Sequence, residues 1–425
     1  MPAYDITRRT RRHADPDVVV VGAGLAGLAA ARALTGRGLT VQLLEATEQV
    51  GGRVAARELD GFRLDDGGQL LNTAYPELAR RLDPARLELR PLAPGVLVHS
   101  GGRRQRFGSP LDKARLGATL GRFAQQPLER LLSRPETTAA RALAERGFAP
   151  RTVDGLLRPL LGALLSDPAL GTSSRVADLV LRSYARGRLC LPAHGMASLP
   201  EQLAEGLPAG TLRLGVQVTA VSADGVETAA HGRIAARAVV VAADARSAVG
   251  LLPGLRLPDF HPVTTYYHAA DRSPLAEPVL LLDADRAGGR SGVSHSLVLT
   301  ELDASYAPPG RALIATTVLG RRTFDGGGPA GHEPEVRRRL AELYGQPTTG
   351  WEFLSMRHQP DAVPAMPPPH NLRRPVRVLA GLYVCGDHRD TSTIQGALVS
   401  GRRAAEAVLR DVGLPREPLV EEAAA

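Results

Sequence analysis

The chain has 425 residues, of which 44% are hydrophobic and 4% aromatic, and its formal net charge is +8 at pH 7. This apolar content excludes a disordered chain, and the length predicts about two or three domains. Cys190 and Cys385 lie far apart without a C-x-x-C spacing, which excludes a disulfide framework and a zinc site. The longest uncharged apolar run, residues 18–31, is too short to span a membrane.

Positive charge is concentrated in two segments. Residues 103–146 contain ten arginine or lysine residues against four acidic ones, and four arginines lie within residues 8–12. Such a surplus fits an anionic membrane surface, an acidic substrate or a solvated helix face. The low aromatic content and the lack of a reading motif argue against nucleic acid as a partner.

The first elements form a β-α-β unit. Residues 17–21 are a β-branched run that predicts a buried strand, residues 25–37 are rich in Ala and Leu and predict a helix, and residues 40–45 predict a second strand. The later patterns predict, in chain order, helices over about 110–188, an antiparallel meander before a strand at 238–242, strands within 259–357, a proline-rich loop at 359–375, a strand within 376–387 and a helix at 394–410.

Gly22, Gly24 and Gly27 form a G-x-G-x-x-G motif between the first strand and the first helix, and Glu45 ends the second strand. Glycine lacks a Cβ atom, so the backbone can turn tightly and another molecule can approach it. This order of elements predicts a dinucleotide site, with pyrophosphate at the helix N-terminus and the acid on the ribose hydroxyls. Tight packing of helix on strand is the alternative role of the glycines.

Two further glycine pairs favour FAD over NAD. The stretch "LEATEQVGGR" places Gly51, Gly52 and Arg53 after the acid, which adds a second close backbone approach and a cation suited to pyrophosphate. The stretch "FRLDDGGQLL" adds Gly67 and Gly68, where backbone can pack against a flat ring.

Here the chain resembles the flavin-containing amine oxidase superfamily, which includes phytoene desaturase-like and protoporphyrinogen oxidase-like enzymes. The resemblance rests on "GAGLAGLAAARAL…GLTVQLLEATEQVGGR" and "LYVCGDHRDTSTIQGALVSGRRAA" and, less closely, on "HGMASLPEQLAEGL" and "GVQVTAVSADG". It implies an α/β fold with a Rossmann-type (GR2-like) FAD-binding domain assembled from discontinuous segments, and a mixed α+β substrate domain with a helical insert. We expect a flexible arm at 1–16, FAD-binding segments at 17–98, 189–258 and 375–412, a helical part (99–188) and a sheet (259–374) of the substrate domain, and a tail at 413–425.

The resemblance also implies which residues contact FAD. They are Gly22, Gly24, Leu25, Ala26, Gly27, Glu45, Ala46, Gly51, Gly52, Arg53, Gly67, Gly68, Gln69, Val218, Gly386, Asp387, Ile394, Gln395, Gly396 and Ala397. In this set Val218 contacts adenine through its backbone, and Asp387 lies near the ribityl and pyrophosphate groups. Residues 394–396 lie beside the isoalloxazine at a helix N-terminus, where the dipole stabilises reduced, anionic flavin. Asp387 could instead cap a helix, and Gln69 and Leu70 could serve only strand packing.

Two departures from the family narrow the interpretation. Lys113 is the only lysine and lies in a basic helical segment, so it is unsuited to the lysine that many amine oxidases place near the flavin. The residues before the last helix contain no cysteine of the kind that covalent-flavin relatives use, so we expect noncovalent FAD. We expect no metal.

The flavin is expected to carry the chemistry, with hydride passing from a substrate C–H to flavin N5 while the protein orients the substrate. The catalytic side chains are unknown at this stage. Candidates are Gln69, His268, His295, Trp351 and His358, and a structural role is open for Trp351 and for each histidine.

We therefore expect an FAD-dependent, desaturase-like oxidoreductase that acts on a largely apolar small molecule and returns electrons to O2 or another acceptor. One alternative is a flavin amine oxidase that releases H2O2, and another is a nonredox flavin isomerase or an escort-type binding protein. The cysteine content fits the cytoplasm. We expect at most a weak peripheral contact between the basic helical region and an anionic membrane.

Overall fold

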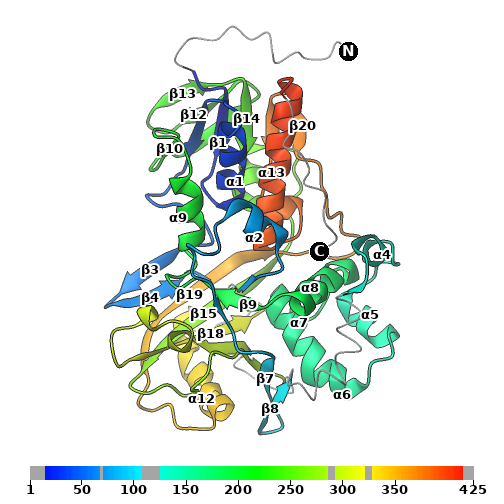
Figure 1. The fold of residues 1–425 in the computed structure, drawn as a ribbon, viewed down its shortest axis with the longest axis vertical. Coiled ribbons are helices and arrows are strands. Elements are labelled where there is room, and N and C mark those ends of the chain that lie inside the picture. The colour runs from blue at the N-terminus through cyan, green and yellow to red at the C-terminus, as the bar shows by residue number, and fades with distance from the viewer. Residues whose placement is uncertain (1–14, 68–69, 108–124, 286–291, 321–327, 415–425) are drawn as a thin grey trace.

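The computed structural model describes residues 15–67, 70–107, 125–285, 292–320 and 328–414. A mostly parallel sheet with its helices forms the upper half of Figure 1, and a large, mostly antiparallel sheet and a block of helices form the lower half. In this part of the chain no helix is long and apolar enough to cross a membrane.

The upper sheet has six strands. In spatial order they are β10 (Leu212–Arg213), β2 (Val41–Leu44), β1 (Val18–Val21), β14 (Ala238–Val241), β21 (Leu382–Val384) and β20 (Arg377–Leu379). All pairs are parallel except β20 with β21. Strands β1 and β14 are buried along their whole length, as continuous apolar runs in a sheet covered on both faces should be. The parallel strands therefore end at one common edge.

Helices cover one face of this sheet, and a meander and a short helix cover the other. The helices on the first face are α1 (Leu25–Thr35), α2 (Pro76–Arg81), α9 (Ser198–Glu205) and α13 (Ile394–Asp411). The short helix on the other face is α10 (Ala245–Leu251). The meander, predicted from the sequence, is β11 (Val218–Ser222), β12 (Gly225–Thr228) and β13 (Gly232–Ala235).

Two glycines allow close backbone contacts of the helices in this half. A Cβ atom on Gly27 would lie 1.9 Å from the carbonyl oxygen of Gly22, and one on Gly401 would lie 2.2 Å from that of Ala26. Gly27 thus lets α1 pack against the turn that precedes it, and Gly401 lets α13 pack against α1. The predicted alternative role for the motif glycines, close packing, therefore holds for Gly27.

The lower sheet has seven strands. In spatial order they are β19 (Glu352–Pro364), β15 (Phe260–Ala270), β18 (Ala312–Leu319), β17 (Val293–Val298), β16 (Leu281–Asp283), β7 (Val96–Ser100) and β8 (Arg103–Phe107). Helix α12 (Glu333–Tyr344) packs on it through Val336, Leu340 and Leu343. Strand β7 begins within the segment 17–98 that we assigned to the cofactor domain, yet it pairs with β16 of this sheet.

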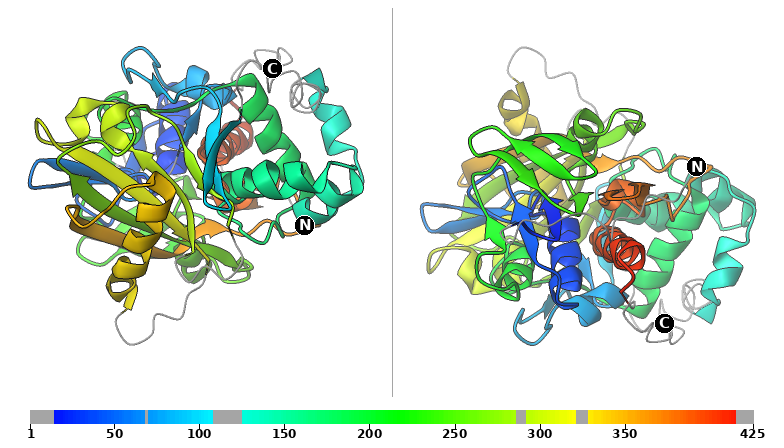
Figure 2. Two further views of the ribbon diagram at one scale, coloured as in Figure 1. Left: turned by 90° about the horizontal axis from the view of Figure 1, so that it is seen from below. Right: turned by 90° about the horizontal axis from the view of Figure 1, so that it is seen from above.

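The predicted helical region is helical where the structure describes it, and it lies beside the lower sheet (Figure 2). Its elements are α4 (Leu128–Leu132), α5 (Ala139–Glu145), α6 (Pro150–Thr152), a π-helical stretch η2 (Val153–Leu157), α7 (Arg158–Leu165) and α8 (Ser174–Arg186). The remaining elements are β3 (Ala56–Leu59), β4 (Phe62–Asp65), β5 (Leu71–Asn72), β6 (Arg90–Pro91), β9 (Leu189–Leu191), η3 (Leu299–Glu301), η4 (Ala304–Tyr306), α11 (Gly328–Gly331) and η5 (Asp387–Arg389). The basic arm at 1–12, Lys113 and the tail from 415 lie outside the described residues.

The prediction of a loop throughout 359–375 is wrong at its start, because β19 continues to Pro364. This strand is at the sheet edge, where a proline without an N–H group is tolerated. The register with β15 shifts between Gln359 and Val363, so residues 360–362 bulge out of the ladder.

A substitution of Gly401 tests the contact between α1 and α13. We expect Gly401→Ala to lower the free energy of unfolding by about 1–3 kcal/mol, because the new methyl group overlaps the Ala26 carbonyl. Gly250→Ala is the matched control: it is exposed in α10 with no atom within 4 Å of its Cβ position, so it should stabilise by about 0.5–1 kcal/mol. Denaturant unfolding measures both, and equal effects would contradict the packing model.

Candidate cofactor and substrate site

A crevice of about 670 Å³ opens at the carboxyl edge of the parallel strands. This is the edge at which doubly wound sheets bind their ligands. Of the predicted cofactor residues, it is lined by Gly22, Gly24, Leu25, Ala26, Glu45, Ala46, Gly51, Gly52, Arg53, Val218, Gly386, Asp387, Ile394 and Ala397. Segments from the start, the middle and the end of the chain thus meet at one site.

Glycine is present at positions 22 and 24 of the first turn for different physical reasons. Gly22 has φ +103°, a conformation that favours glycine, and its Cβ position lies 3.0 Å from the Ala242 carbonyl oxygen. Gly24 has an ordinary φ of −72°, and only the Gly51 carbonyl oxygen lies within 4 Å of its Cβ position, at 4.0 Å. Protein packing therefore does not require glycine at position 24. The bare backbone at Gly24 is instead available to a molecule in the crevice.

Glu45 fastens the end of β2 to the glycine turn. Its Oε2 accepts a hydrogen bond from the Ala23 N–H at 2.8 Å, and its Oε1 accepts from the N–H and hydroxyl of Thr47 at 3.0 and 2.9 Å. Oε2 therefore keeps a further lone pair for a hydroxyl donor.

Arg53 joins three distant parts of the chain. Its guanidinium donates to Asp387 Oδ1 at 2.7 Å and to the Ala362 carbonyl at 2.7 Å. Burial opposes its charge, but the carboxylates of Asp387 and Asp244 outweigh this effect and raise the pKa of Arg53. Arg53 is therefore a fixed, permanently charged cation in the wall of the crevice.

Helices α1, α10 and α13 begin at the crevice, so their positive ends face it. Thr393 caps α13 by accepting from the Gly396 N–H, and Asp244 caps α10 by accepting from the N–H groups of Arg246 and Ser247. Asp244 and Ser247 line the crevice and were missed in the sequence. The signal was available: they follow the buried strand β14 in the same strand-to-helix pattern as the first turn.

Two smaller chambers continue inward from the crevice. The outer one, about 120 Å³, shares Gln359, Ala362, Thr393 and Ile394 with the crevice. The inner one, about 30 Å³, shares Gly67, Leu70, His295 and Thr317 with the outer one. The outer chamber is lined by apolar side chains, hydroxyls, amides and His295, with no carboxylate, lysine or arginine among its described lining residues.

Besides Tyr75 and Tyr267, a histidine and an aspartate line these chambers. His295 is 6% exposed, and burial lowers its pKa to about 4, so it is neutral at pH 7. Asp65 lines the inner chamber, and burial raises its pKa to about 6, although hydrogen bonds from the Met196 N–H and the Tyr306 hydroxyl favour its ionised form.

Some of the remaining predicted residues line the crevice or the chambers, and others do not. Gly396 packs against the Thr391 carbonyl, and the Gln395 side chain accepts from the Glu77 N–H at 3.0 Å, so neither lines the crevice. His268 bonds to Glu333 at 2.9 Å and packs near Trp351 behind the lower sheet, away from the crevice and both chambers. Gly67 lines both chambers, His358 lines the crevice, and Gly68 and Gln69 lie outside the described residues.

A cluster with the composition of a metal site is already occupied by a side chain. The ligand atoms of His99, Asp283 and Asp285 lie within 4.8 Å of one another. The Arg339 guanidinium donates to Asp283 at 2.6 and 2.7 Å and to Asp285 at 3.1 Å. An internal cation therefore neutralises this group.

Comparison with known proteins identifies the family. The family model described as flavin containing amine oxidoreductase matches residues 25–409. The chain belongs to this family. Hydroxysqualene dehydroxylase of Rhodopseudomonas palustris is 30% identical over 92% of this chain and 98% of the relative. Phytoene dehydrogenase of Streptomyces griseus is 42% identical, but over only 24% of this chain and 20% of the relative. The solved structure of an oxidoreductase from Methanosarcina mazei has a TM-score of 0.71 at 18% identity, over 92% of this chain and 99% of that one.

The protein is thus an FAD-dependent oxidoreductase, and the predicted FAD-binding fold and cofactor are confirmed. The crevice fits FAD on its own physical features. Its volume lies in the usual range for cofactor sites, it exposes bare backbone at Gly24, and it presents one fixed arginine and helix N-termini to the phosphates.

Gly24 provides a test of cofactor contact that is separate from folding. We expect Gly24→Ala to weaken FAD binding by at least about tenfold, because a methyl group enters the space where backbone meets pyrophosphate. The free energy of unfolding of the apoprotein should stay within about 0.5 kcal/mol of that of the parent protein. Fluorescence titration of the apoprotein with FAD measures the binding. Gly250→Ala, which should leave FAD affinity unchanged, is the control.

His295 predicts a pH dependence of stability. The unfolded side chain takes up a proton near pH 6.5, whereas the folded one does so only near pH 4. Between these values the unfolded state binds more protons, so acidification destabilises the fold, by about 3 kcal/mol for this residue. His295→Gln should reduce the loss of unfolding free energy between pH 7 and 4. The same change at exposed His194 should not, and equal slopes in both variants would refute the assignment.

Proposed function

We propose that this FAD-dependent oxidoreductase acts on an apolar isoprenoid alcohol and removes its hydroxyl group. The observation that carries the proposal is the likeness to a hydroxysqualene dehydroxylase over nearly the whole of both chains. The likeness to a phytoene dehydrogenase, by contrast, is confined to 111 aligned residues. Desaturation of an apolar substrate is therefore the second candidate.

The lining of the outer chamber supports a neutral substrate. Leu164, Val180 and Val263 offer apolar contacts, and Ser183 and Thr317 offer hydroxyl groups. A protonated amine would lose its hydration there without gaining a carboxylate partner, which is strongly unfavourable. This argues against the amine oxidase alternative. The chamber has room for the reacting end of a long isoprenoid rather than for the whole molecule.

The crevice residues would hold FAD noncovalently. Gly22, Gly24 and Arg53 would contact the pyrophosphate, Glu45 would accept from the adenosine ribose, and Val218 would contact adenine through its backbone. FAD, when bound and reduced by an external electron donor, would supply the hydride that the reaction consumes.

The chain's own residues must exclude water and supply a proton. Replacement of a C–O bond by a C–H bond with release of water consumes one hydride and one proton. His295 is neutral at pH 7, so it can accept a hydrogen bond from the substrate hydroxyl but is a poor acid. Asp65 holds a proton up to about pH 6 and is the better donor to the leaving oxygen.

The direction of electron flow separates the candidates. We expect anaerobic, dithionite-reduced enzyme to regain its yellow colour when hydroxysqualene is added, with squalene detected by mass spectrometry. Oxidised enzyme should keep its colour with phytoene or putrescine. Bleaching by phytoene would select desaturation and bleaching by putrescine would select amine oxidation, and either result would refute the dehydroxylase proposal.

Asp65→Asn is the companion variant. It keeps the size of the side chain but cannot release a proton in this pH range, so squalene formation should slow while the visible spectrum of bound FAD is unchanged. A variant with full activity would remove Asp65 from the proposed mechanism.

A cytoplasmic location and a weak contact with anionic membrane through the basic region around residues 103–146 remain parts of this proposal. The low water solubility of an isoprenoid substrate supports the membrane contact.

A further inference from the structure

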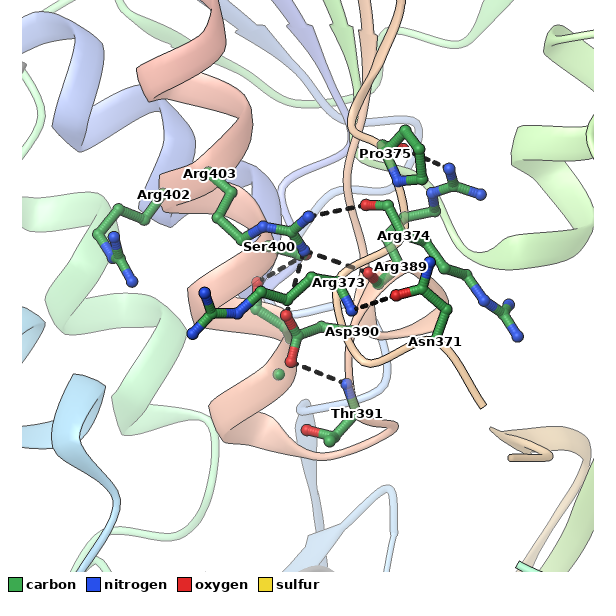
Figure 3. Close-up of polar contacts among 12 residues, drawn as sticks. Asn371, Arg373, Arg374, Pro375, Arg389, Asp390, Thr391, Ser400, Arg402 and Arg403 are labelled. Carbon is green, nitrogen blue, oxygen red and sulfur yellow. Dashed lines mark hydrogen bonds and ion pairs between the residues drawn. The ribbon is translucent and has the colours of Figure 1, made fainter. Parts of the chain in front are cut away.

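Arginines gather on the outer side of the turn that carries Asp387. They come from the end of the proline-rich stretch, from η5 and from α13, and two of them, Arg373 and Arg403, lie beside the carboxylate of Asp390 (Figure 3). The members of this arginine cluster are Arg373, Arg374, Arg389 and Arg403.

Backbone carbonyls hold three of the four guanidinium groups in place. Arg374 donates to the His388 carbonyl at 3.1 Å, Arg403 donates to the Arg374 carbonyl at 2.8 Å, and Arg389 donates to the Pro375 carbonyl. Each bond fixes a side chain without neutralising it, because a carbonyl carries no net charge. The cluster is therefore preorganised and remains strongly positive.

Nearby carboxylates do not balance the positive charge of the arginine cluster. Asp390 Oδ2 accepts from Arg403 at 3.2 Å and is the only carboxylate paired to the cluster among the described residues. Neighbouring carboxylates are bound elsewhere: Asp387 to Arg53, Glu406 to Arg402, and Glu136 to Ser173 and Arg175. Burial lowers the pKa of both Arg374 and Arg389. Repulsion from Arg256 lowers the pKa of Arg374 further, and repulsion from Arg374 and Arg403 lowers that of Arg389 further.

Buried polar atoms without partners gather at the same place. His388 and His370 are each 6% exposed, and within the described chain neither nitrogen of His388 nor the Nδ1 of His370 has a hydrogen-bond partner. The Nε of Arg389 is also buried and has no hydrogen-bond partner within the described chain. These atoms are four of the seven buried orphan side-chain atoms in the described part of the chain. His370 donates its Nε2–H to the Asp390 carbonyl, so its Nδ1 lacks a donor, whereas the Arg389 Nε–H and the single N–H of neutral His388 each lack an acceptor.

We propose that the arginine cluster binds a phosphate group of a second ligand, distinct from FAD. Phosphate supplies the oxygen acceptors and the negative charge that this site lacks, and the planar guanidinium fork matches its geometry. A soluble phosphate or diphosphate ester and the headgroup of an anionic lipid share this chemistry.

The site adjoins the cofactor crevice through a single turn. His388 and Arg389 follow Asp387 directly in η5, and Asp387 binds Arg53 on the crevice side. An anion on the outer side would steady this turn, so its binding should slow the release of FAD. The inference does not depend on which substrate the enzyme reduces or oxidises.

The test uses FAD-saturated holoenzyme, in which the pyrophosphate contacts of the crevice are already filled. We expect inorganic pyrophosphate to bind saturably in isothermal titration calorimetry and to raise Tm above that in chloride of equal ionic strength. Arg373→Gln should weaken this binding about tenfold, because one charge-assisted contact is lost. Arg373 is exposed and its side chain makes no hydrogen bond within the described chain, so the fold should persist.

Arg410→Gln is the control, an exposed arginine near the end of α13 and outside the cluster. Equal losses in the two variants, or no saturable binding of pyrophosphate or of vesicles, would overturn the proposal. Co-sedimentation with phosphatidylglycerol vesicles separates the two sources. Vesicle binding that Arg373→Gln weakens and Arg410→Gln does not assigns the site to lipid headgroups, and pyrophosphate binding alone assigns it to a soluble phosphate. In both supportive cases the ligand should slow FAD release in a stopped-flow exchange assay.

Discussion

The cofactor crevice depends on one close approach of backbones, that of α13 to α1. Gly401 lies where any side chain would overlap the Ala26 carbonyl, so the two helices can pack at a distance that larger residues forbid. This contact places the start of α13, with Ile394 and Ala397, opposite the glycine turn at the start of α1. Two segments separated by more than 300 residues therefore line one site only because small residues occupy the seam.

A second constraint couples the two halves of the molecule. Strand β19 belongs to the lower sheet, yet its bulged residues 360–362 line the crevice of the upper half. Arg53 bonds to the Ala362 carbonyl, and Arg246 forms a bidentate pair with Asp361 at 2.5 and 2.8 Å. The strand thus serves both as an edge of the lower sheet and as a wall of the crevice, so that one piece of backbone joins the two halves of the molecule.

Charge is distributed unevenly between surface and interior. All but one of the basic residues are arginines, which stay protonated in proteins. The crevice contains a fixed arginine, whereas the described lining of the outer chamber contains no charged side chain. His295 and Asp65 line the chambers, and burial shifts their pKa values in opposite senses.

The sequence by itself determined the cofactor half of the protein. Local rules act there: a buried strand, glycines at fixed spacing, a helix and Glu45 are specified within some 30 residues, and the family resemblance supplied the distant partner segments. Local patterns failed where an environment overrode them. Pro360 and Pro364 suggested a loop, but an edge position and a bulge allow both residues within β19.

The tertiary structure alone decided the roles of the titratable residues. The three histidine candidates had no distinguishing spacing, and the fold placed His295 in the chambers, His358 at the crevice, and His268, with Trp351, behind the lower sheet. Gln395 and Gly396 were brought near the site, but helix geometry turned the first toward Glu77 and packed the second against Thr391. Burial and the direction of a side chain result from contacts between residues that are distant along the chain, so no local pattern encodes them.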